Sequence, residues 1–402
     1  MQRLRAGCAT LAITLIGICF SLESAAANCT NTGSFEAWMQ GFRREALAKG
    51  ITARTVSAAL DGITLDQGVI ARDRKQTFFT QSFIDFVGKL ATENRRKSSL
   101  NQIAKHRAVF DRAEKEFGVP APVLTAFWAL ESDFGAGMGK LSVLRSLATL
   151  AYDCRRGELF REELLEALRI IDKGDLEPSD MIGSWAGELG QTQFLPSHYN
   201  THAIDYDGDG RRDLFRSIPD IIGSSAKFVV HLGWRRGEPW LEEVRVPERL
   251  PWDQADLAIL HPRSKWAEWG VTRTNGSPLP NDAVPASLLL MVGRNGPAFL
   301  AYQNFRVYTE WNKSLNYATT AAYLATRIAG APPMSRGRGP VEVLDDKEVR
   351  ELQRLLTRKG YNVGEIDGLL GATTRAAVKQ AQMKYNLPAD SYPTKELIER
   401  LR

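Results

Sequence analysis

The sequence predicts a mainly helical α+β protein with a small β-containing insertion and a separate helical module at its C-terminal end. Three observations lead to this fold class. Apolar residues recur at helical spacing from Phe35 to Ile170, where strand-like alternation is scarce. Short runs rich in Val, Leu and Trp lie between Pro and Gly from about Leu241 to Val307. A Pro- and Gly-rich segment, 331–340, then precedes about 60 residues with renewed helical periodicity.

The composition is that of an ordinary globular protein. The chain has 402 residues, of which 44% are hydrophobic and 25% are charged, and this length is enough for two or three domains. These values exclude collagen-like, coiled-coil and wholly disordered chains. The 52 Lys and Arg residues exceed the 47 Asp and Glu residues by only five, so the charge does not indicate a nucleic-acid partner.

The first residues have the pattern of a secretory signal peptide. Arg3 and Arg5 precede an apolar stretch from Ala6 to Phe20, and small residues then lead to a cleavage site after Ala27. The apolar stretch is about 15 residues long, too short for a hydrocarbon core that needs about 20. We therefore expect residues 1–27 to be removed and the rest of the chain to be exported. We expect no membrane span and no lipidated cysteine.

The predicted mature chain keeps two cysteines, Cys29 and Cys154. An oxidising compartment lets them pair, so we expect one disulfide bond between them. Two separate free thiols are the alternative, because a pair of cysteines constrains the connectivity little.

One helix of the body ends in a candidate catalytic residue. Pro120 and Pro122 favour a helix start, an apolar run follows them, and the run ends at Glu131 before a glycine-rich turn. A carboxyl at the end of an apolar helix face is partly desolvated. Burial raises the pKa of a carboxyl toward the value that a general acid needs near neutral pH. A solvated or capping Glu at a helix end is the alternative.

A second candidate segment runs from Ser184 to Ser197. Ser184 and Gln193 offer neutral donors and acceptors that suit sugar hydroxyls and N-acetyl amides. Taken alone, the segment also fits a glycine-rich turn into a helix with a satisfied buried Gln.

Together the two segments resemble a known family. Residues 128–135, Trp-Ala-Leu-Glu-Ser-Asp-Phe-Gly, are followed about fifty residues later by 187–197, Gly-Glu-Leu-Gly-Gln-Thr-Gln-Phe-Leu-Pro-Ser. This pair resembles the lytic murein transglycosylases of the membrane-bound B type. The resemblance implies a lysozyme-like catalytic region over 28–330 with helical and β subdomains. It also implies cleavage of the β-1,4 bond between N-acetylmuramic acid and N-acetylglucosamine in peptidoglycan, in the periplasm.

The resemblance also implies roles for single residues. Glu131 matches the sole catalytic acid/base. Trp311 and Phe228 stand where family members commonly have tyrosines, so Phe228 keeps a stacking face but lacks a hydroxyl. The substrate-binding residues expected on this basis are Ser184, Gln193, Phe228, Trp311, Asn312 and Tyr317.

The implied mechanism needs one carboxyl, whereas most glycosidases use two. Protonated Glu131 donates to the glycosidic oxygen, and the resulting carboxylate removes the proton from the C6 hydroxyl of the same sugar. That oxygen attacks C1 and closes a 1,6-anhydro ring. Two alternatives stay open: a muramidase that hydrolyses the same bond with water, and a catalytically silent wall-binding protein.

A calcium loop is predicted from 205 onward. Asp205, Asp207 and Asp209 occupy the first three ligand positions, Gly210 the sharp turn, and Arg211 the backbone-carbonyl position. Arg216 stands where an EF-hand has its bidentate Glu, and the family resemblance points instead to Asp220 as the last carboxylate. We expect a structural Ca²⁺ and no organic cofactor. An Asp-Gly turn with solvated carboxylates is the alternative.

The C-terminal module, 341–402, resembles the peptidoglycan-binding domains attached to many cell-wall enzymes. Helical periodicity predicts three helices, and Asp367-Gly-x-x-Gly-x-x-Thr374 is characteristic of that family. The resemblance implies attachment to glycan strands, with a spacer or a dock for proteins of wall synthesis or hydrolysis as alternatives. We expect a monomer whose partner is peptidoglycan.

Overall fold

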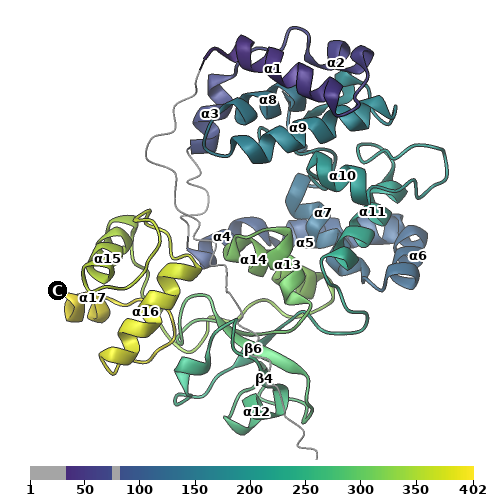
Figure 1. The fold of residues 1–402 in the computed structure, drawn as a ribbon. Coiled ribbons are helices and arrows are strands. Elements are labelled where there is room, and N and C mark those ends of the chain that lie inside the picture. The colour runs from purple at the N-terminus through teal and green to yellow at the C-terminus, as the bar shows by residue number, and fades with distance from the viewer. Residues whose placement is uncertain (1–32, 75–81) are drawn as a thin grey trace, which may run out of the picture.

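The structure is a computed structural model that describes residues 33–74 and 82–402. Helices from two separate stretches of the chain, 35–74 and 143–172, form one subdomain, at the top of Figure 1. Its core contains Phe42, Leu147, Phe160 and Leu164. The helices are α1 (Phe35–Ala48), α2 (Ala53–Leu60), α3 (Gln67–Arg74), α8 (Val143–Tyr152) and α9 (Gly157–Asp172).

A second group of helices forms the centre of the molecule (Figure 1). Within it α7 is buried on nearly every face, because α14, α5, α6 and α11 all pack against it. The helix predicted from Pro120 to Glu131 is confirmed as α7, which continues one residue further. The group comprises α4 (Phe83–Leu90), α5 (Glu93–Lys105), α6 (Arg107–Phe117), α7 (Ala121–Ser132), α11 (Ile218–His231), α13 (Phe305–Trp311) and α14 (Leu315–Ile328); α10 (Pro196–His202) packs on both α9 and α11.

The predicted β-containing insertion is confirmed as a five-stranded antiparallel sheet of order β4-β6-β7-β3-β5. Leu290 pairs with Ala298 and Leu241 with Ala301, so β7 lies between β6 and β3. Trp252 and Trp266 belong to the small core beside the sheet. The strands are β3 (Leu241–Arg245), β4 (His261–Pro262), β5 (Thr272–Arg273), β6 (Pro285–Leu290) and β7 (Ala298–Ala301), with α12 (Arg263–Glu268) after β4; a separate two-stranded ribbon joins β1 (Leu141–Ser142) to β2 (Ile182–Gly183).

The C-terminal module has the three predicted helices, α15 (Asp346–Arg358), α16 (Ala372–Lys384) and α17 (Lys395–Leu401). They enclose a core of their own that includes Leu352, Val378 and Leu397. The module is also bound to the β insertion. Arg375 donates to the carbonyl oxygen of Leu290 at 2.6 Å, and an ion pair joins Lys379 to Asp256 at 2.9 Å.

The segment 331–340, expected to be a linker, contains neither helix nor strand and lies against the body. The N–H of Met334 donates to the Tyr323 hydroxyl at 2.9 Å, and the N–H of Arg338 donates to the Asn295 carbonyl at 2.7 Å. Hydrogen bonds at Met334 and Arg338 therefore hold this linker segment against the body.

Two predictions concern residues that the structure does not describe. The signal peptide, 1–27, and Cys29 both lie outside the described residues. Cys154 is disulfide-bonded. Within residues 33–74 and 82–402, no helix has the length and apolar character needed to cross a bilayer.

Candidate active site

Glu131 lies at the C-terminal end of α7, half-buried, where two donors from other helices meet its carboxyl. The indole N–H of Trp311, at the end of α13, donates to Oε1 of Glu131 at 2.7 Å. The hydroxyl of Tyr317, in α14, donates to the same oxygen. Two of the six predicted substrate-binding residues, Trp311 and Tyr317, therefore bind the predicted catalytic carboxyl.

The pKa of Glu131 is raised to about 7, chiefly by burial. The charge of Glu188 acts in the same direction, and the bonds from Tyr317 and Trp311 act in the opposite direction. Desolvation raises the pKa of a carboxyl because it disfavours the charged form. A carboxyl with this pKa is protonated in an appreciable fraction of molecules at neutral pH. It can therefore serve as an acid and, after losing its proton, as a base.

Aromatic rings hold Trp311 in place behind the carboxyl. The Phe127 ring stacks on Trp311 with centroids 4.2 Å apart, and Tyr308 stacks on Phe127 at 4.9 Å. Phe228 lies 5.2 Å from Trp311 and is 5% exposed. Phe228 therefore packs against Trp311, whose indole N–H binds Glu131.

Histidine rings complete the packing on the other side of Phe228. His198 and His202 lie 4.5 Å and 4.9 Å from it, measured between ring centroids. Burial lowers the pKa of His202 to about 4, so its imidazole is neutral at physiological pH.

Ser184 begins a tight turn that follows β2. Its hydroxyl donates to Oε2 of Glu188 at 2.8 Å and accepts the N–H groups of Ala186 and Glu188 at 3.1 Å and 3.2 Å. Gln193, the other polar residue expected here, has a positive φ of 51°. Its side-chain amide donates to the Gly190 carbonyl at 2.8 Å, which braces the loop.

Gln191, which had no predicted role, connects the two motifs. Its side-chain oxygen accepts the indole N–H of Trp128 at 2.7 Å, and its backbone carbonyl accepts the Ser132 hydroxyl at 2.6 Å. A buried Trp needs an acceptor for its N–H. That need is the signal that could have drawn attention to this glutamine.

A cavity of about 1530 Å³ lies beside this site. Glu188 and Asn312 line it, and Asn312 directly follows Trp311, whose indole N–H binds Glu131. The Asn312 side chain accepts the N–H of Ser314 at 2.9 Å. The lining residues of the body include Arg156, Trp185 and Asn316, and those of the C-terminal module include Gly368, Leu369, Leu370, Gly371, Ala372, Arg375 and Tyr392.

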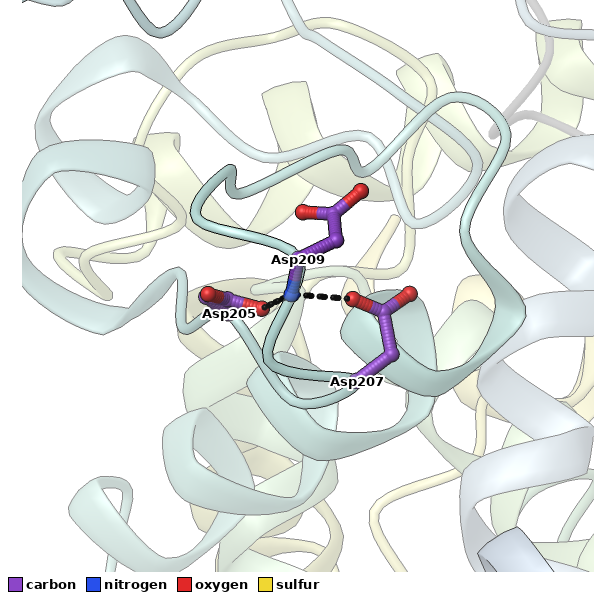
Figure 2. Close-up of side chains that lie close together, drawn as sticks. All are labelled: Asp205, Asp207 and Asp209. Carbon is purple, nitrogen blue, oxygen red and sulfur yellow. Dashed lines mark hydrogen bonds between the residues drawn. The ribbon is translucent and has the colours of Figure 1, made fainter.

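The predicted calcium loop brings Asp205, Asp207 and Asp209 together, with one carboxylate oxygen from each within 4.8 Å of the others. Figure 2 shows the three side chains around the N–H of Asp209, which donates to Asp205 and Asp207. Carboxylate oxygens are the ligands that Ca²⁺ prefers. The donor set of this curled loop therefore fits a calcium ion.

Asp220 lies next to this loop but has a different use in the structure. Its fully buried carboxylate accepts the backbone N–H groups of Tyr206 and Asp213 at 2.6 Å and 2.8 Å. Through these bonds Asp220 supports the loop backbone. It is not among the three clustered carboxylates. The N–H of Arg211 donates to Asp209 at 2.8 Å.

The chain matches two known protein families. Residues 34–326 match the transglycosylase SLT domain family, and residues 345–401 match a peptidoglycan binding domain family. The chain belongs to the SLT transglycosylase family. The resemblance stated from the sequence motifs is confirmed, and so is the expected fold class.

Several relatives of this SLT transglycosylase have been solved. SltB3 from Pseudomonas aeruginosa, solved with NAG-anhNAM-pentapeptide, is 40% identical, with 92% of this chain and 100% of that chain covered and a TM-score of 0.86. Slt35 from Escherichia coli, solved with calcium, is 26% identical, with 77% and 98% covered and a TM-score of 0.64.

A curated relative covers a smaller part. Membrane-bound lytic murein transglycosylase B from Escherichia coli is 30% identical over 226 residues, or 56% of this SLT transglycosylase. The matched region spans 61% of the length of that relative.

Proposed function

We propose that the chain is a peptidoglycan lytic transglycosylase that cleaves the β-1,4 bond between N-acetylmuramic acid and N-acetylglucosamine. The products carry 1,6-anhydromuramic acid ends, and Glu131 is the single acid/base. One observation carries the proposal: the Glu131 carboxyl is desolvated, with a pKa of about 7, and is held by Trp311 and Tyr317.

The hydrogen bonds indicate where the catalytic proton resides. Oε1 of Glu131 accepts from both Trp311 and Tyr317, so the proton of the neutral acid is carried by Oε2. Oε2 donates this proton to the glycosidic oxygen as the bond from C1 to that oxygen breaks, and positive charge develops at C1. The two donors on Oε1 stabilise the carboxylate that remains.

The second step restores the acid. The Glu131 carboxylate takes the proton of the C6 hydroxyl on the same muramic acid, and O6 forms a bond to C1. The nucleophile belongs to the substrate, so its effective concentration is high and no water needs to be positioned. The anhydro sugar in the complex of SltB3 supports this outcome.

Mass spectrometry of muropeptides released from purified sacculi tests the proposal. We expect anhydro ends from the wild-type chain and loss of nearly all release with Glu131→Gln. Reducing ends would identify a muramidase instead. No release by a folded wild-type protein would identify a wall-binding protein without activity.

We also propose that the loop of Asp205, Asp207 and Asp209 holds a structural Ca²⁺, with the backbone carbonyl of Arg211 as a further ligand. Asp220, the last carboxylate that the resemblance implies, is proposed as a further ligand, because each of its oxygens keeps a lone pair beside its backbone bonds. The calcium complex of Slt35 supports this assignment. Bound there, the ion would neutralise three carboxylates that repel one another.

Three further proposals concern the whole chain. The C-terminal module binds peptidoglycan and holds the catalytic body near its insoluble substrate. The chain is exported to the periplasm by residues 1–27, and Cys29 pairs with Cys154 there. Co-sedimentation of the full chain with sacculi, N-terminal sequencing of the secreted protein and a thiol count test them in turn.

A further inference from the structure

Arg156, which directly precedes α9, lies in the wall of the cavity beside the candidate active site. Its Nη2 donates to the buried carboxylate of Asp73 in α3, and its guanidinium carbon lies 4.8 Å from the centroid of the Phe160 ring. The side chain is nevertheless 36% exposed. An ion pair and an aromatic ring therefore hold this cation in place, and a fixed side chain loses little conformational entropy when a ligand binds.

Asp73 does not neutralise Arg156 fully, because two arginines share it. Nε of Arg155 donates to Oδ2 of Asp73 at 2.6 Å, and Nη2 of Arg155 donates to the Asp73 carbonyl at 3.0 Å. The neighbouring carboxylate of Asp153 binds Arg74 at 2.7 Å. These five side chains carry three positive charges and two negative ones. Of the two arginines on Asp73, Arg156 alone is among the described residues that line the cavity.

The other charges of the cavity wall also favour an anionic ligand. The two acidic side chains of the described lining have partners of their own: the Ser184 hydroxyl donates to Glu188 at 2.8 Å, and Arg350 donates to Asp346 at 3.0 Å. Within the part of the chain that the structure describes, the ion pair of Arg156 is with Asp73 and with neither of these two. The cationic residues of the lining are Arg72, Arg156, Lys313 and Arg375.

We propose that the peptide stem of the cleaved muramic acid enters this cavity and that Arg156 binds a carboxylate of the stem, which makes Arg156 a specificity-determining residue for peptide-substituted glycan. A guanidinium has five N–H donors and matches the plane of a carboxylate, so donors remain beside the bond to Asp73. Asn312 lines the same cavity and directly follows Trp311, whose indole N–H binds Glu131. The inference rests on the proposed function and names the substrate class of the same site.

Two forms of one substrate test the proposal: soluble peptidoglycan oligomers with free stem carboxyls, and the same oligomers after these carboxyls have been converted to amides. The release of anhydro-muropeptides is followed by mass spectrometry. We expect the wild-type chain to cleave the free-acid form with a kcat/KM about tenfold higher, because amidation removes the charge that Arg156 binds. Arg156→Gln should abolish this preference by raising KM for the free-acid form alone.

A third substrate identifies the source of the carboxylate. Glycan strands freed of peptide by an amidase keep a carboxylate on the lactyl group of muramic acid, but they have no stem. We expect Arg156→Gln to leave kcat/KM for these strands unchanged. A tenfold loss on these strands would show that Arg156 binds the lactyl carboxylate and would overturn the assignment to the stem.

Two variants separate ligand binding from support of the fold. Arg155→Gln is the matched control, since Arg155 binds the same carboxylate of Asp73. It should lower the melting temperature about as much as Arg156→Gln and keep the preference for free carboxyls. Arg156→Lys keeps the positive charge without the planar fork. It should show a preference between those of the wild-type chain and Arg156→Gln, which keeps the test decisive even if Arg156→Gln folds poorly.

The outcomes distinguish this inference from the function itself. A wild-type chain that forms anhydro ends equally fast from the free-acid and amidated forms would overturn the role of Arg156 alone. A preference that Arg155→Gln and Arg156→Gln reduce equally would also overturn it, because both arginines would then act only through Asp73. A wild-type chain that forms no anhydro products would overturn the proposed function.

Discussion

Two donors from different helices meet on one oxygen of Glu131, and this arrangement decides how a single carboxyl can act twice. Trp311 and Tyr317 occupy Oε1, which leaves Oε2 for the proton. Burial keeps that proton in place near neutral pH, and the two donors stabilise the carboxylate once the proton has left. The acid and base roles therefore depend on the same three side chains.

Removing the ionisable group should stabilise the fold at alkaline pH. Glu131 has a pKa of about 7 in the folded protein against an ordinary value of 4.5, so between these values the unfolded chain binds fewer protons and stability falls as pH rises. We expect Glu131→Gln to raise the free energy of unfolding by about 1–3 kcal/mol at pH 8. At pH 4 we expect no difference. Denaturant titrations at both pH values measure this, and an equal change at both would contradict it.

Trp311→Phe removes the indole N–H and keeps a ring for stacking on Phe127. The bond from Trp311 lowers the pKa of Glu131, so its loss should move the alkaline limb of activity to higher pH. We expect release of muropeptides to fall about tenfold, because the carboxylate loses one of two donors. A limb that moves to lower pH would contradict this role.

At the scale of elements, the site depends on two turns that follow regular structure. After α7, Asp133 and Phe134 both have positive φ angles, 50° and 61°, and the chain leaves the helix directly behind Glu131. After β2, the turn from Ser184 presents Glu188. Bonds from Gln191 join the two segments, so the motifs form one packed unit.

Gly183→Ala should disturb this unit. A Cβ would lie 2.0 Å from the Glu188 carbonyl oxygen and 2.9 Å from Val143, so the turn must move. We expect a loss of about 1–3 kcal/mol in the free energy of unfolding and a larger proportional loss of activity. Gly88→Ala in α4 is the matched control: its Cβ would meet nothing within 4 Å, and it should leave activity unchanged. Equal activity in both variants would contradict the argument.

Calcium should stabilise the loop of Asp205, Asp207 and Asp209. We expect millimolar Ca²⁺ to raise the melting temperature and a chelator to lower it, since the ion binds the folded loop preferentially. Asp207→Asn removes one clustered carboxylate and should abolish most of this response, whereas Mg²⁺ should substitute poorly. Calorimetric titration that detects no binding to the wild-type chain would remove the proposed site.

At the scale of the whole molecule, the C-terminal module is a wall of the cavity as well as a separate core. Arg375 is half-buried in the interface and donates to the carbonyl oxygens of Leu290 and Met291. Substrate that reaches the cavity therefore meets the module and the catalytic body together.

Arg375→Ala should loosen the module from the body. Two carbonyl acceptors lose their charged donor, and each unmet buried group costs about 1–3 kcal/mol. We expect trypsin to cleave faster within 331–340, where Arg336 and Arg338 lie. The control Arg358→Ala removes an exposed arginine of α15 and should not change the cleavage rate. Equal rates would show that the interface does not depend on Arg375.

Much of this protein followed from local sequence. The extent of α7, the β-containing insertion and the three helices of the module depend on periodicity and turn residues, which act over a few positions. Glu131 was recognisable because an apolar run ends on a carboxyl. Only the tertiary structure decided that Trp311, 180 positions away, donates to it, and that the module lines the cavity. Contacts at such separations depend on how helices pack, and packing leaves no periodic trace in the sequence.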